Sequence, residues 1–453
     1  MEKRIVIVGG GISGLALLHY LKKKYRGCED VYVTLLEKNS HLGGTIHTIK
    51  EGHFTFESGP NGFLSRASAI RDLARELDLS GQMIHADSQA KIRSISVKNK
   101  LHVVPNNPIS FLFMELLSFT DVVRILTEIF VPKGKADDES VFDFGKRRLG
   151  ENFTKIFLDC VVSGIFGGDV KRLSMKSAFP KVYNLEQSYG SLIKGVFHLK
   201  GKKDKETVAG PKGSLMSFKG GMGEIIERMY TQYGEHIRMS ETVETILKNE
   251  GQFFIKTDKN HFQADEVYLC TPSYHAAEIL GNLDKELSGL LDEIFYAPIM
   301  VVGLGYEKSD FPKSPKGFGY LIPSSENRDI LGVVFSSNIF PGRAGEDEIL
   351  MQVMLGGAHH PRLGDRSTFE LVDLAKNEIK MRFGAKSEPK KVFSVFWPKA
   401  IPQYNLGYSK LLEKIGSRLE KIPGLFLAAN YIGGPSLNDC VAHSQLTSQK
   451  SRL

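Results

Sequence analysis

Cysteine is scarce in this chain, which has four cysteines among 453 residues. They lie far apart in the sequence, at Cys28, Cys160, Cys270 and Cys440. This spacing argues against a disulfide framework and predicts reduced cysteines in a cytosolic protein. No histidine stands at metal-ligand spacing from any of them, and the adjacent His359 and His360 would point to opposite faces of a strand. We therefore expect no bound metal ion.

Long hydrophobic runs and a signal peptide are also missing. An uncharged stretch such as residues 294–306 has 13 residues, short of the roughly 20 that a membrane-spanning helix needs. The apolar run at residues 5–8 leads directly into a glycine turn instead of a cleavage site. We expect a cytoplasmic protein, either free or attached peripherally to the inner face of the cell membrane.

The excess of one sign of charge is small. A formal net charge of +7 is spread over 453 residues, with a pI near 8.9. This balance gives no reason to expect nucleic acid, and it suits acidic small substrates or an anionic membrane surface equally well. The length is too great for one compact core and predicts two or three domains.

A glycine-rich turn stands near the start of the chain. Residues 5–8 are β-branched and predict a strand buried on both faces, as in a parallel sheet. Gly9, Gly11 and Gly14 then give G-x-G-x-x-G, and a helix is predicted behind them. These glycines allow the tight turn, the close approach of a pyrophosphate and the packing of helix on strand. The pattern predicts a dinucleotide whose phosphates lie at the helix N-terminus.

An acidic residue stands where the ribose of such a nucleotide would lie. Glu37 ends the second predicted strand, 23 residues after Gly14, close to the spacing expected for a ribose-binding carboxylate. Its charge disfavours NADP, because it would repel a 2′-phosphate. The segment 302–308 contains G-x-G without the last glycine, so we expect no second nucleotide site.

The rest of the chain divides by pattern. Residues 90–105 predict a hairpin with its turn at 98–100, and residues 295–395 predict a mainly antiparallel sheet that roofs a cavity. The pattern turns helical from residue 108 to about 200. Within it, residues 110–130 are strongly apolar, and they predict either a core helix pair or a surface that touches membrane or covers an apolar ligand.

Several segments spread along the chain resemble one flavoprotein family. They are GGGISGLA, GPNGF, VVSGIFGGD, LSMKSAFP, GFGYLIPSSE, VMLGG, KAIPQYNLGY and NDC. Of these, GFGYLIPSSE followed by IPQYNLGY is far more specific than the glycine turn. The chain is similar to the protoporphyrinogen oxidase and coproporphyrinogen III oxidase family, in the amine-oxidase-like superfamily of FAD-dependent flavoproteins.

The resemblance implies an α/β fold with three domains. A discontinuous, Rossmann-like FAD-binding domain would comprise residues 1–85, 215–295 and 396–453. An antiparallel-sheet substrate domain would comprise residues 86–107 and 296–395. A mostly helical domain, facing membrane or substrate, would comprise residues 108–214.

The resemblance also implies which residues hold FAD. In the first part of the chain these would be Gly9, Gly10, Gly11, Ile12, Ser13, Gly14, Glu37, Lys38, Gly43, Gly44, Thr45, Gly59, Pro60, Asn61 and Gly62. Val243 would meet the adenine side, and the isoalloxazine would be lined by Trp397, Asn430, Pro435, Ser436 and Leu437. Residues 436–438 open a predicted helix, whose N-terminus could stabilise negative charge on the reduced cofactor.

A tetrapyrrole with carboxylates on its rim would be the substrate. The resemblance implies that Arg93 grips a propionate, that Phe318 and Leu321 sandwich the macrocycle, that Met354 adds a wall and that the stretch from Gly164 to Phe166 borders the mouth. The implied reaction is the six-electron oxidation of protoporphyrinogen IX to protoporphyrin IX in haem biosynthesis, with dioxygen as acceptor and H2O2 formed. No acid–base pair stands out, which fits a reaction carried by the cofactor, so no catalytic side chain is assigned.

Four alternatives stay open at this point. Coproporphyrinogen III oxidation would use the same chemistry, with extra cations such as Arg66, Lys91, Lys171 and Arg172 at the rim. An amine oxidase would form an aromatic cage, for example from Trp397 and Tyr431, and a carotenoid desaturase would need a longer apolar tunnel. A flavin-bound scaffold would catalyse nothing. Further implied partners are a ferrochelatase that receives the product and, as one open oligomeric state, a second copy of the chain in a homodimer.

Overall fold

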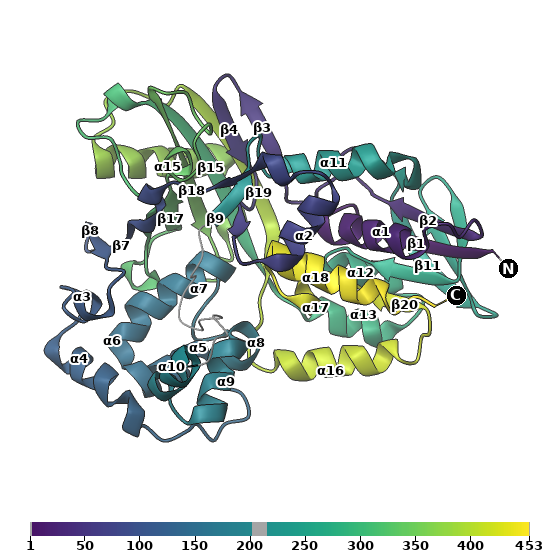
Figure 1. Cartoon of the computed structure of the whole chain (residues 1–453), viewed down its shortest axis with the longest axis horizontal. Helices are drawn as coiled ribbons and strands as arrows, with labels where there is room; N and C mark the ends of the chain where they lie inside the picture. Colours follow the sequence, from purple (N-terminus) through teal and green to yellow (C-terminus); the bar gives the residue numbers. More distant parts are fainter. Residues whose placement is uncertain (1, 202–214, 453) are drawn as a thin grey trace.

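The structure is a computed structural model that describes residues 2–201 and 215–452. Residues 202–214, the end of the predicted helical domain, lie outside the described residues. The fold is α/β, as predicted. Figure 1 shows a parallel sheet with its helices at the right, a large sheet at the upper left and a group of helices at the lower left, with both termini at the right-hand end.

A five-stranded parallel sheet carries the glycine turn. Its strands lie in the order β10 (Ile237–Arg238), β2 (Val31–Leu36), β1 (Lys3–Val8), β14 (Glu266–Leu269) and β20 (Leu425–Leu427). On one face pack α1 (Ile12–Lys24), α2 (Ser68–Glu76), α11 (Gly223–Tyr233) and α18 (Leu437–Ser448). The other face packs against the sheet of β11 (Val243–Asn249), β12 (Gln252–Thr257) and β13 (His261–Ala264), with α12 (Ser273–Leu280) and α13 (Lys285–Asp292). Both faces are therefore buried, as the apolar run of β1 predicts.

The large sheet has seven strands. Their order is β19 (Lys391–Pro402), β15 (Tyr296–Glu307), β18 (Glu348–Gly356), β17 (Ile330–Val334), β16 (Gly319–Leu321), β7 (Arg93–Val97) and β8 (Lys100–Val104). Its pairs are antiparallel except β16 with β7, which are parallel. That exception was not predicted, because the two strands lie more than 200 residues apart and no local pattern reports such a pairing. The hairpin of β7 and β8 is as predicted, and its turn residues Lys98 and Asn99 both have positive φ, the conformation of a tight two-residue turn.

The lower-left region of Figure 1 is helical. Its elements are α3 (Pro108–Leu112), α4 (Phe119–Leu126), η3 (Thr127–Phe130), α5 (Val141–Leu149), α6 (Glu151–Phe153), η4 (Thr154–Leu158), α7 (Asp159–Phe166), α8 (Met175–Ala178), α9 (Pro180–Tyr189) and α10 (Leu192–Gly201). A fully buried guanidinium, that of Arg148, joins Glu128 at 2.8 Å and also pairs with Glu186. None of the helices in the described ranges is long and apolar enough to cross a membrane.

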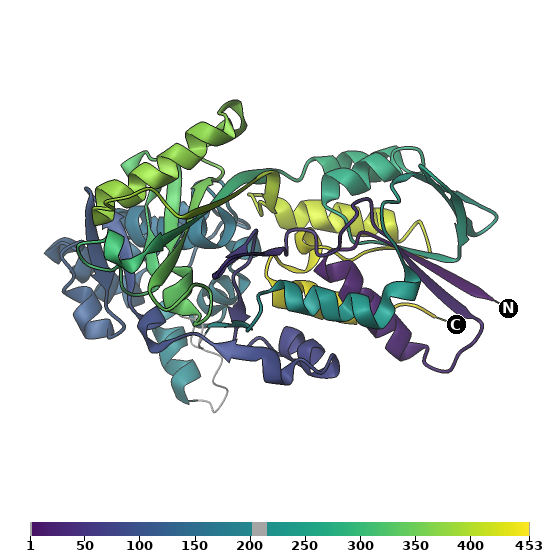
Figure 2. The ribbon, with the colours of Figure 1, turned by 90° about the horizontal axis from the view of Figure 1, so that it is seen from above.

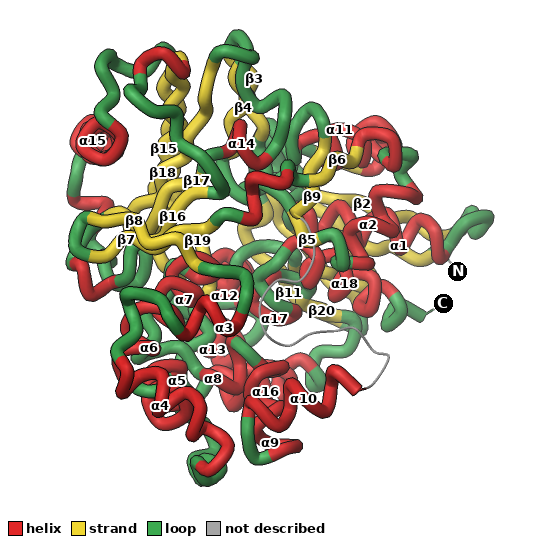
Figure 3. The backbone as a smooth tube through the Cα atoms, turned by 60° about the vertical axis from the view of Figure 1, so that its left-hand side comes forward, coloured by secondary structure: helices red, strands yellow, loops and turns green. Residues whose placement is uncertain are grey.

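The long strands β15 and β19 carry the chain between the large sheet and the region of the parallel sheet. Figure 2 shows this arrangement from above and Figure 3 shows the backbone as a tube. Further elements belong to the described part of the chain. They are β3 (Thr48–Glu51), β4 (Phe54–Glu57), β5 (Phe63–Leu64), β6 (Met83–His85), β9 (Leu215–Phe218), α14 (Ser336–Ile339), α15 (Thr368–Phe383), α16 (Tyr408–Leu419) and α17 (Asn430–Gly433). Of these, α15 covers one face of the seven-stranded sheet.

Candidate functional site

The turn between β1 and α1 brings strand and helix into unusually close contact. Gly9 has φ +108°, and its N–H donates to the Leu36 carbonyl at 2.8 Å. A Cβ on Gly14 would lie 1.9 Å from the Gly9 carbonyl oxygen. Only glycine at position 14 therefore lets the helix begin so near the strand.

The N-cap residue of α1 borders open space, although the first residues of the helix are buried. Its N-cap, Gly11, has no side chain, and the helix starts with the uncharged residues Ile12, Ser13 and Gly14. No atom of the described residues lies within 4 Å of the position that a Cβ on Gly11 would take. The backbone N–H groups of a helix start carry partial positive charge and bind phosphates. The residues present here therefore fit the pyrophosphate of a dinucleotide.

Glu37 is tied to the same turn. Its Oε2 accepts a hydrogen bond from the Gly10 N–H at 2.6 Å, and its Oε1 accepts the backbone and side-chain N–H groups of Asn39 at 2.9 and 2.7 Å. A carboxylate has about four acceptor positions, so capacity remains for a ribose hydroxyl. The Glu241 N–H donates to the Glu37 carbonyl at 2.9 Å. This contact brings the start of β11, where Val243 lies buried, next to the acidic strand end.

Two glycine segments lie side by side beyond this turn. The Gly43 N–H donates to the Gly10 carbonyl at 2.9 Å, while Gly44 and Thr45 are exposed. A Cβ on Gly59 would lie 2.4 Å from the Thr45 carbonyl oxygen. Residues 43–45 and residues 59–62 are therefore in contact in the tertiary structure. The family resemblance implies that both segments bind the same cofactor.

Trp397 connects these loops to the large sheet. Its Nε1–H donates to the Ser58 carbonyl at 2.9 Å, one residue before Gly59. Its ring packs in a cluster with Ile299, Val301 and Met354. The loop that carries Ser58 and one face of the seven-stranded sheet therefore meet at this side chain.

Residues 430–437 reach the site from the C-terminal end. Ser436 caps α18, where it accepts the Asp439 N–H at 3.2 Å and donates to its carboxylate at 2.6 Å. The helix docks on α1, with the Ser444 hydroxyl donating to the Ser13 carbonyl at 2.9 Å. Asp439 places a negative charge at the helix N-terminus and offsets its positive end.

One face of the seven-stranded sheet gathers three of the six predicted substrate residues, Arg93, Leu321 and Met354. Residues directly opposite in a ladder point to the same side. One such row comprises Val395, Val301, Met354, Gly332, Leu321 and Ile95. The next row comprises Phe393, Gly303, Gln352, Val334, Gly319 and Arg93. Together with Trp397, opposite Ile299 in a third row, we call this surface the site face.

The site face has two packed borders and a cationic end. A Cβ on Gly164 would lie 3.0 Å from Leu321 Cδ1, so α7 borders one side, while the ring of Phe56 fills the space above Gly303. Five strand intervals of about 4.8 Å separate β19 from β7, so Arg93 lies roughly 24 Å across the sheet from Trp397. The face therefore runs from Trp397, beside the loops of residues 43–45 and 59–62, to Arg93 on β7, the strand next to the edge strand β8.

Arg93 stacks on an aromatic ring instead of pairing with an acid. Its guanidinium lies 5.1 Å from the centroid of the Phe318 ring. The protein around the guanidinium lowers the pKa of Arg93 by desolvation, but arginine remains a cation at neutral pH. Among the described residues it has no acidic partner within salt-bridge distance. An exposed, oriented guanidinium of this kind can bind a carboxylate bidentately.

Three side chains that were candidates for the site do not point into it. Phe166 is 1% exposed and packs against Phe179 and Tyr404, so its ring belongs to the core beneath α7. Lys38 is turned outward, with its Nζ 2.8 Å from His275 Nε2. Tyr431 is fully buried, which leaves Trp397 without the partner that an aromatic cage would need. Local sequence does not report which way such side chains turn.

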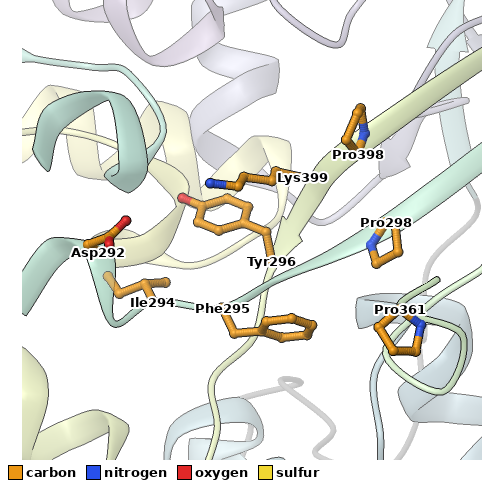
Figure 4. Close-up of a pocket in the computed structure, with 8 residues that line it drawn as sticks. All are labelled: Asp292, Ile294, Phe295, Tyr296, Pro298, Pro361, Pro398 and Lys399. Carbon is orange, nitrogen blue, oxygen red and sulfur yellow. The ribbon is translucent and has the colours of Figure 1, made fainter. Parts of the chain in front are cut away.

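A separate cavity of about 260 Å³ lies where β15 begins, and Figure 4 shows its lining. The lining residues are Asp292, Ile294, Phe295, Tyr296, Pro298, Pro361, Pro398 and Lys399. Lys399 lies with its Nζ 4.3 Å from the centroid of the Tyr274 ring. These residues differ from all of the predicted site residues, so this cavity is distinct from the site face.

Sequence reasoning missed the residues that hold the site together. Ser58 links residues 43–48 to Trp397, and Tyr404 and Tyr408 hold the start of α17 through their hydroxyl groups. Both tyrosines stand in the quoted segment KAIPQYNLGY, but nothing in that segment tells which carbonyls they reach. Pro435 was a usable signal, because a proline four residues after Tyr431 leaves that residue's carbonyl without a helical partner.

The chain is similar to known proteins over nearly its whole length. Residues 12–449 match the family model described as flavin containing amine oxidoreductase. The chain is 32% identical to the chloroplastic protoporphyrinogen oxidase of Oryza sativa subsp. japonica, over 96% of this chain and 85% of that protein. It is 25% identical to the coproporphyrinogen III oxidase of Bacillus subtilis (strain 168), over 97% and 96%.

Solved structures share the fold. A crystal structure from Exiguobacterium sp. 255-15 superimposes with a TM-score of 0.85 at 24% identity, covering 99% of this chain and 98% of that one. Cyclohexylamine oxidase from Brevibacterium oxydans IH-35A gives a TM-score of 0.72 at 15% identity, covering 99% and 98%.

Proposed function

The chain belongs to the flavin-containing amine oxidoreductase family, and on that premise we propose that it oxidises a porphyrinogen to a porphyrin. It is an FAD-dependent oxidoreductase. The observation that carries the substrate proposal is the site face, an apolar surface that starts at Trp397 beside the cofactor loops and ends at the unpaired cation Arg93. A porphyrinogen is an apolar macrocycle with carboxylates on its rim, and this surface matches both properties.

In this proposal different segments of the chain bind different parts of FAD. The glycine turn and Glu37 hold the pyrophosphate and ribose, Val243 lies toward the adenine, and residues 43–45, 59–62 and 430–437 with Trp397 hold the isoalloxazine. The chemistry that bound FAD would supply is acceptance of hydride from a carbon of the substrate and transfer of the electrons to dioxygen. Three such cycles remove six electrons and six protons from the macrocycle and give three H2O2.

The side chains of the sheet domain orient the substrate. Arg93 binds a rim carboxylate, while Phe318, Leu321 and Met354 contact the macrocycle and exclude water. Gly164 leaves room for α7 to approach Leu321. No side chain of the site face is assigned as a general base, and the pyrrole protons pass to solvent as the macrocycle tautomerises.

Protoporphyrinogen IX is our first choice of substrate and coproporphyrinogen III the second. The first choice rests on the higher identity to protoporphyrinogen oxidases and on the guanidinium of Arg93, which has no acidic partner in the described part of the chain, at a mainly apolar surface. A tetracarboxylate would gain more from additional cations. Comparison of kcat/KM for the two substrates decides, and a clear preference for coproporphyrinogen III would reverse our order.

Peripheral membrane contact is the second part of the proposal. Large apolar side chains of α3, α4, η3 and the turn after α3 are exposed: Ile109, Phe113, Phe119, Val123, Leu126 and Phe130. The phenylalanines among them are 80–83% exposed, and the positive net charge suits an anionic bilayer. An enzyme at the membrane would receive an apolar substrate there and pass the porphyrin to a ferrochelatase, either as a monomer or as a homodimer.

Co-sedimentation with anionic phospholipid vesicles tests the membrane contact. We expect Phe113→Ser with Phe119→Ser to abolish sedimentation, because two large apolar anchors are lost. Phe369→Ser is the matched control, since Phe369 is also 80% exposed but lies on α15. Equal sedimentation of both variants and the original chain would contradict the proposed surface.

The reaction itself is tested by mixing the purified FAD-loaded chain with protoporphyrinogen IX in air. We expect the Soret band of a porphyrin to appear together with H2O2. Gly11→Asp is the control, because its side chain enters space free of described protein atoms and puts a negative charge where the pyrophosphate would bind. A yellow wild-type protein that produces no porphyrin would favour the scaffold alternative.

A further inference from the structure

The segment from Gln403 to Tyr408 presents two buried hydroxyl groups to a single turn. The Tyr404 hydroxyl donates to the Asn430 carbonyl, and the Tyr408 hydroxyl donates to the Tyr431 carbonyl at 2.6 Å. The two rings stack with centroids 4.5 Å apart and planes at 16°. Two consecutive carbonyls at the start of α17 are therefore held by one stacked pair of tyrosines.

These carbonyls need partners from outside their own helix. In an α-helix the carbonyl of residue i accepts the N–H of residue i+4, and the last carbonyls of a helix are left open. For Tyr431 the fourth residue onward is Pro435, which has no N–H. Since α17 ends at Gly433 and Tyr431 is fully buried, water cannot replace the missing donor. The tyrosine hydroxyls supply it instead.

Both hydroxyls remain neutral donors. Burial raises the pKa of Tyr404 and of Tyr408 far above the ordinary value, and the neighbouring acidic and phenolic groups raise it further. The backbone N–H of Gly434 acts on the Tyr404 hydroxyl in the opposite direction. The raised pKa values keep both tyrosines protonated at neutral pH, where each hydroxyl can donate its hydrogen bond.

The segment is also fixed from its other side. Gln403 Nε2–H donates to the Phe166 carbonyl at 2.8 Å, and the Ser174 N–H donates to the Tyr404 carbonyl at 2.8 Å. Phe166 packs its ring on Tyr404 with centroids 5.7 Å apart. The tyrosine pair therefore stands between the helical region and the turn, and it cannot shift without moving both.

We infer that Tyr404 and Tyr408 are positioning residues for the cofactor, which place Asn430 and residues 435–437 against the isoalloxazine by fixing the carbonyls of residues 430 and 431. The inference rests on the proposed contacts of residues 430–437 with FAD. Neither tyrosine is proposed to touch the substrate or the cofactor.

The test compares Tyr404→Phe and Tyr408→Phe with Tyr233→Phe in the full chain. Tyr233 is a matched control, since it is 8% exposed against 6% and 4% for Tyr404 and Tyr408, and its hydroxyl lies 2.9 Å from His19 Nδ1, between α1 and α11. Four quantities are measured: the dissociation constant of FAD from recovery of its fluorescence, the visible band of the bound flavin, the melting temperature, and kcat and KM with protoporphyrinogen IX.

We expect each site variant to weaken FAD binding about tenfold, because a buried carbonyl loses its donor. The visible band of the bound flavin should shift and kcat should fall, with KM unchanged. Tyr233→Phe should lower the melting temperature by a similar amount but keep the wild-type FAD affinity and spectrum. Should Tyr408→Phe fail to fold, Tyr404→Phe carries the same expectation.

Site variants that melt earlier but retain wild-type FAD affinity and spectrum would overturn the inference. Equal weakening of FAD binding by Tyr233→Phe would overturn it as well, since the effect would then be general destabilisation. A wild-type chain that binds FAD but leaves porphyrinogen unchanged would instead refute the proposed substrate, while the comparison of FAD affinities would still stand.

Discussion

The two faces of the seven-stranded sheet come from the same strands but differ in what covers them. One face lies under α15, and its residues Met300, Val302, Val333, Met351 and Val353 are all buried. The site face alternates with it along each strand, and there Met354, Val395 and Trp397 stay only partly buried. Apolar side chains on the covered face are fully packed, whereas Met354, Val395 and Trp397 on the site face keep part of their surface exposed.

Charged side chains on the two faces differ in whether they have a partner of opposite charge. Beneath α15, Glu378 accepts the Tyr320 hydroxyl at 2.5 Å and pairs with Arg328 and Arg382. Arg93, on the site face, stacks on Phe318. Buried charges are costly unless they are paired, so the covered face has a closed network. An exposed cation that has no acidic partner is a candidate for ligand binding.

Truncation of two methionines on β18 should show the largest contrast. Met351→Ala should lower the free energy of unfolding by about 2–5 kcal/mol, because it opens a cavity under α15. Met354→Ala should cost less than about 1.5 kcal/mol, because its side chain is only partly buried, but it should reduce kcat/KM for porphyrinogen. Chemical denaturation and steady-state kinetics measure the two effects, and equal destabilisation would mean that the faces do not differ as described.

Removal of the unpaired cation should give the next largest effect. Arg93→Ala should raise KM for porphyrinogen about 10–100-fold, since a hydrogen bond to a charged group contributes about 1.5–3 kcal/mol. The free energy of unfolding should change by no more than about 0.5 kcal/mol and FAD content should be unchanged. Parallel loss of FAD and of substrate affinity would show that Arg93 has a structural role.

Acidification should weaken the ion pairs of Glu378 on the covered face. We expect its effect on stability to be smaller than the effects of the substitutions described above. Burial alone would raise the pKa of Glu378, but the Tyr320 hydrogen bond and the charges of Arg328 and Arg382 lower it below 4.5. The stabilisation from this carboxylate is therefore complete above pH 4.5 and is lost as the pH falls through the lower value of the folded state.

Melting temperatures of the wild type and Glu378→Gln, followed from neutral pH to below 4.5, measure this loss. The variant should be less stable at neutral pH, and the gap between the two proteins should narrow on acidification. A gap that stays constant with pH would mean that the carboxylate charge contributes nothing.

The cofactor turn could be predicted from local sequence, whereas the substrate surface could be predicted only through resemblance. Gly9 and Gly14 occupy conformations and contacts that exclude a side chain, so residue type reports the structure directly. Arg93, Leu321 and Met354 share a face because strands far apart in sequence pair in a particular register. Phe166 was predicted as a border of the mouth but lies in the core, because side-chain direction within α7 depends on packing against Tyr404.

The sequence by itself determined the glycine turn, the acid at the end of the second strand and the order of strands and helices. These features follow from backbone freedom, charge and periodicity over a few residues. Only the tertiary structure decided that Trp397 joins the cofactor loops to the site face, that Tyr404 and Tyr408 complete the turn at residues 430–431, and that Tyr431 is buried. Those outcomes depend on which distant strands pair and which buried carbonyls lack a donor, and neither is visible until the chain has folded.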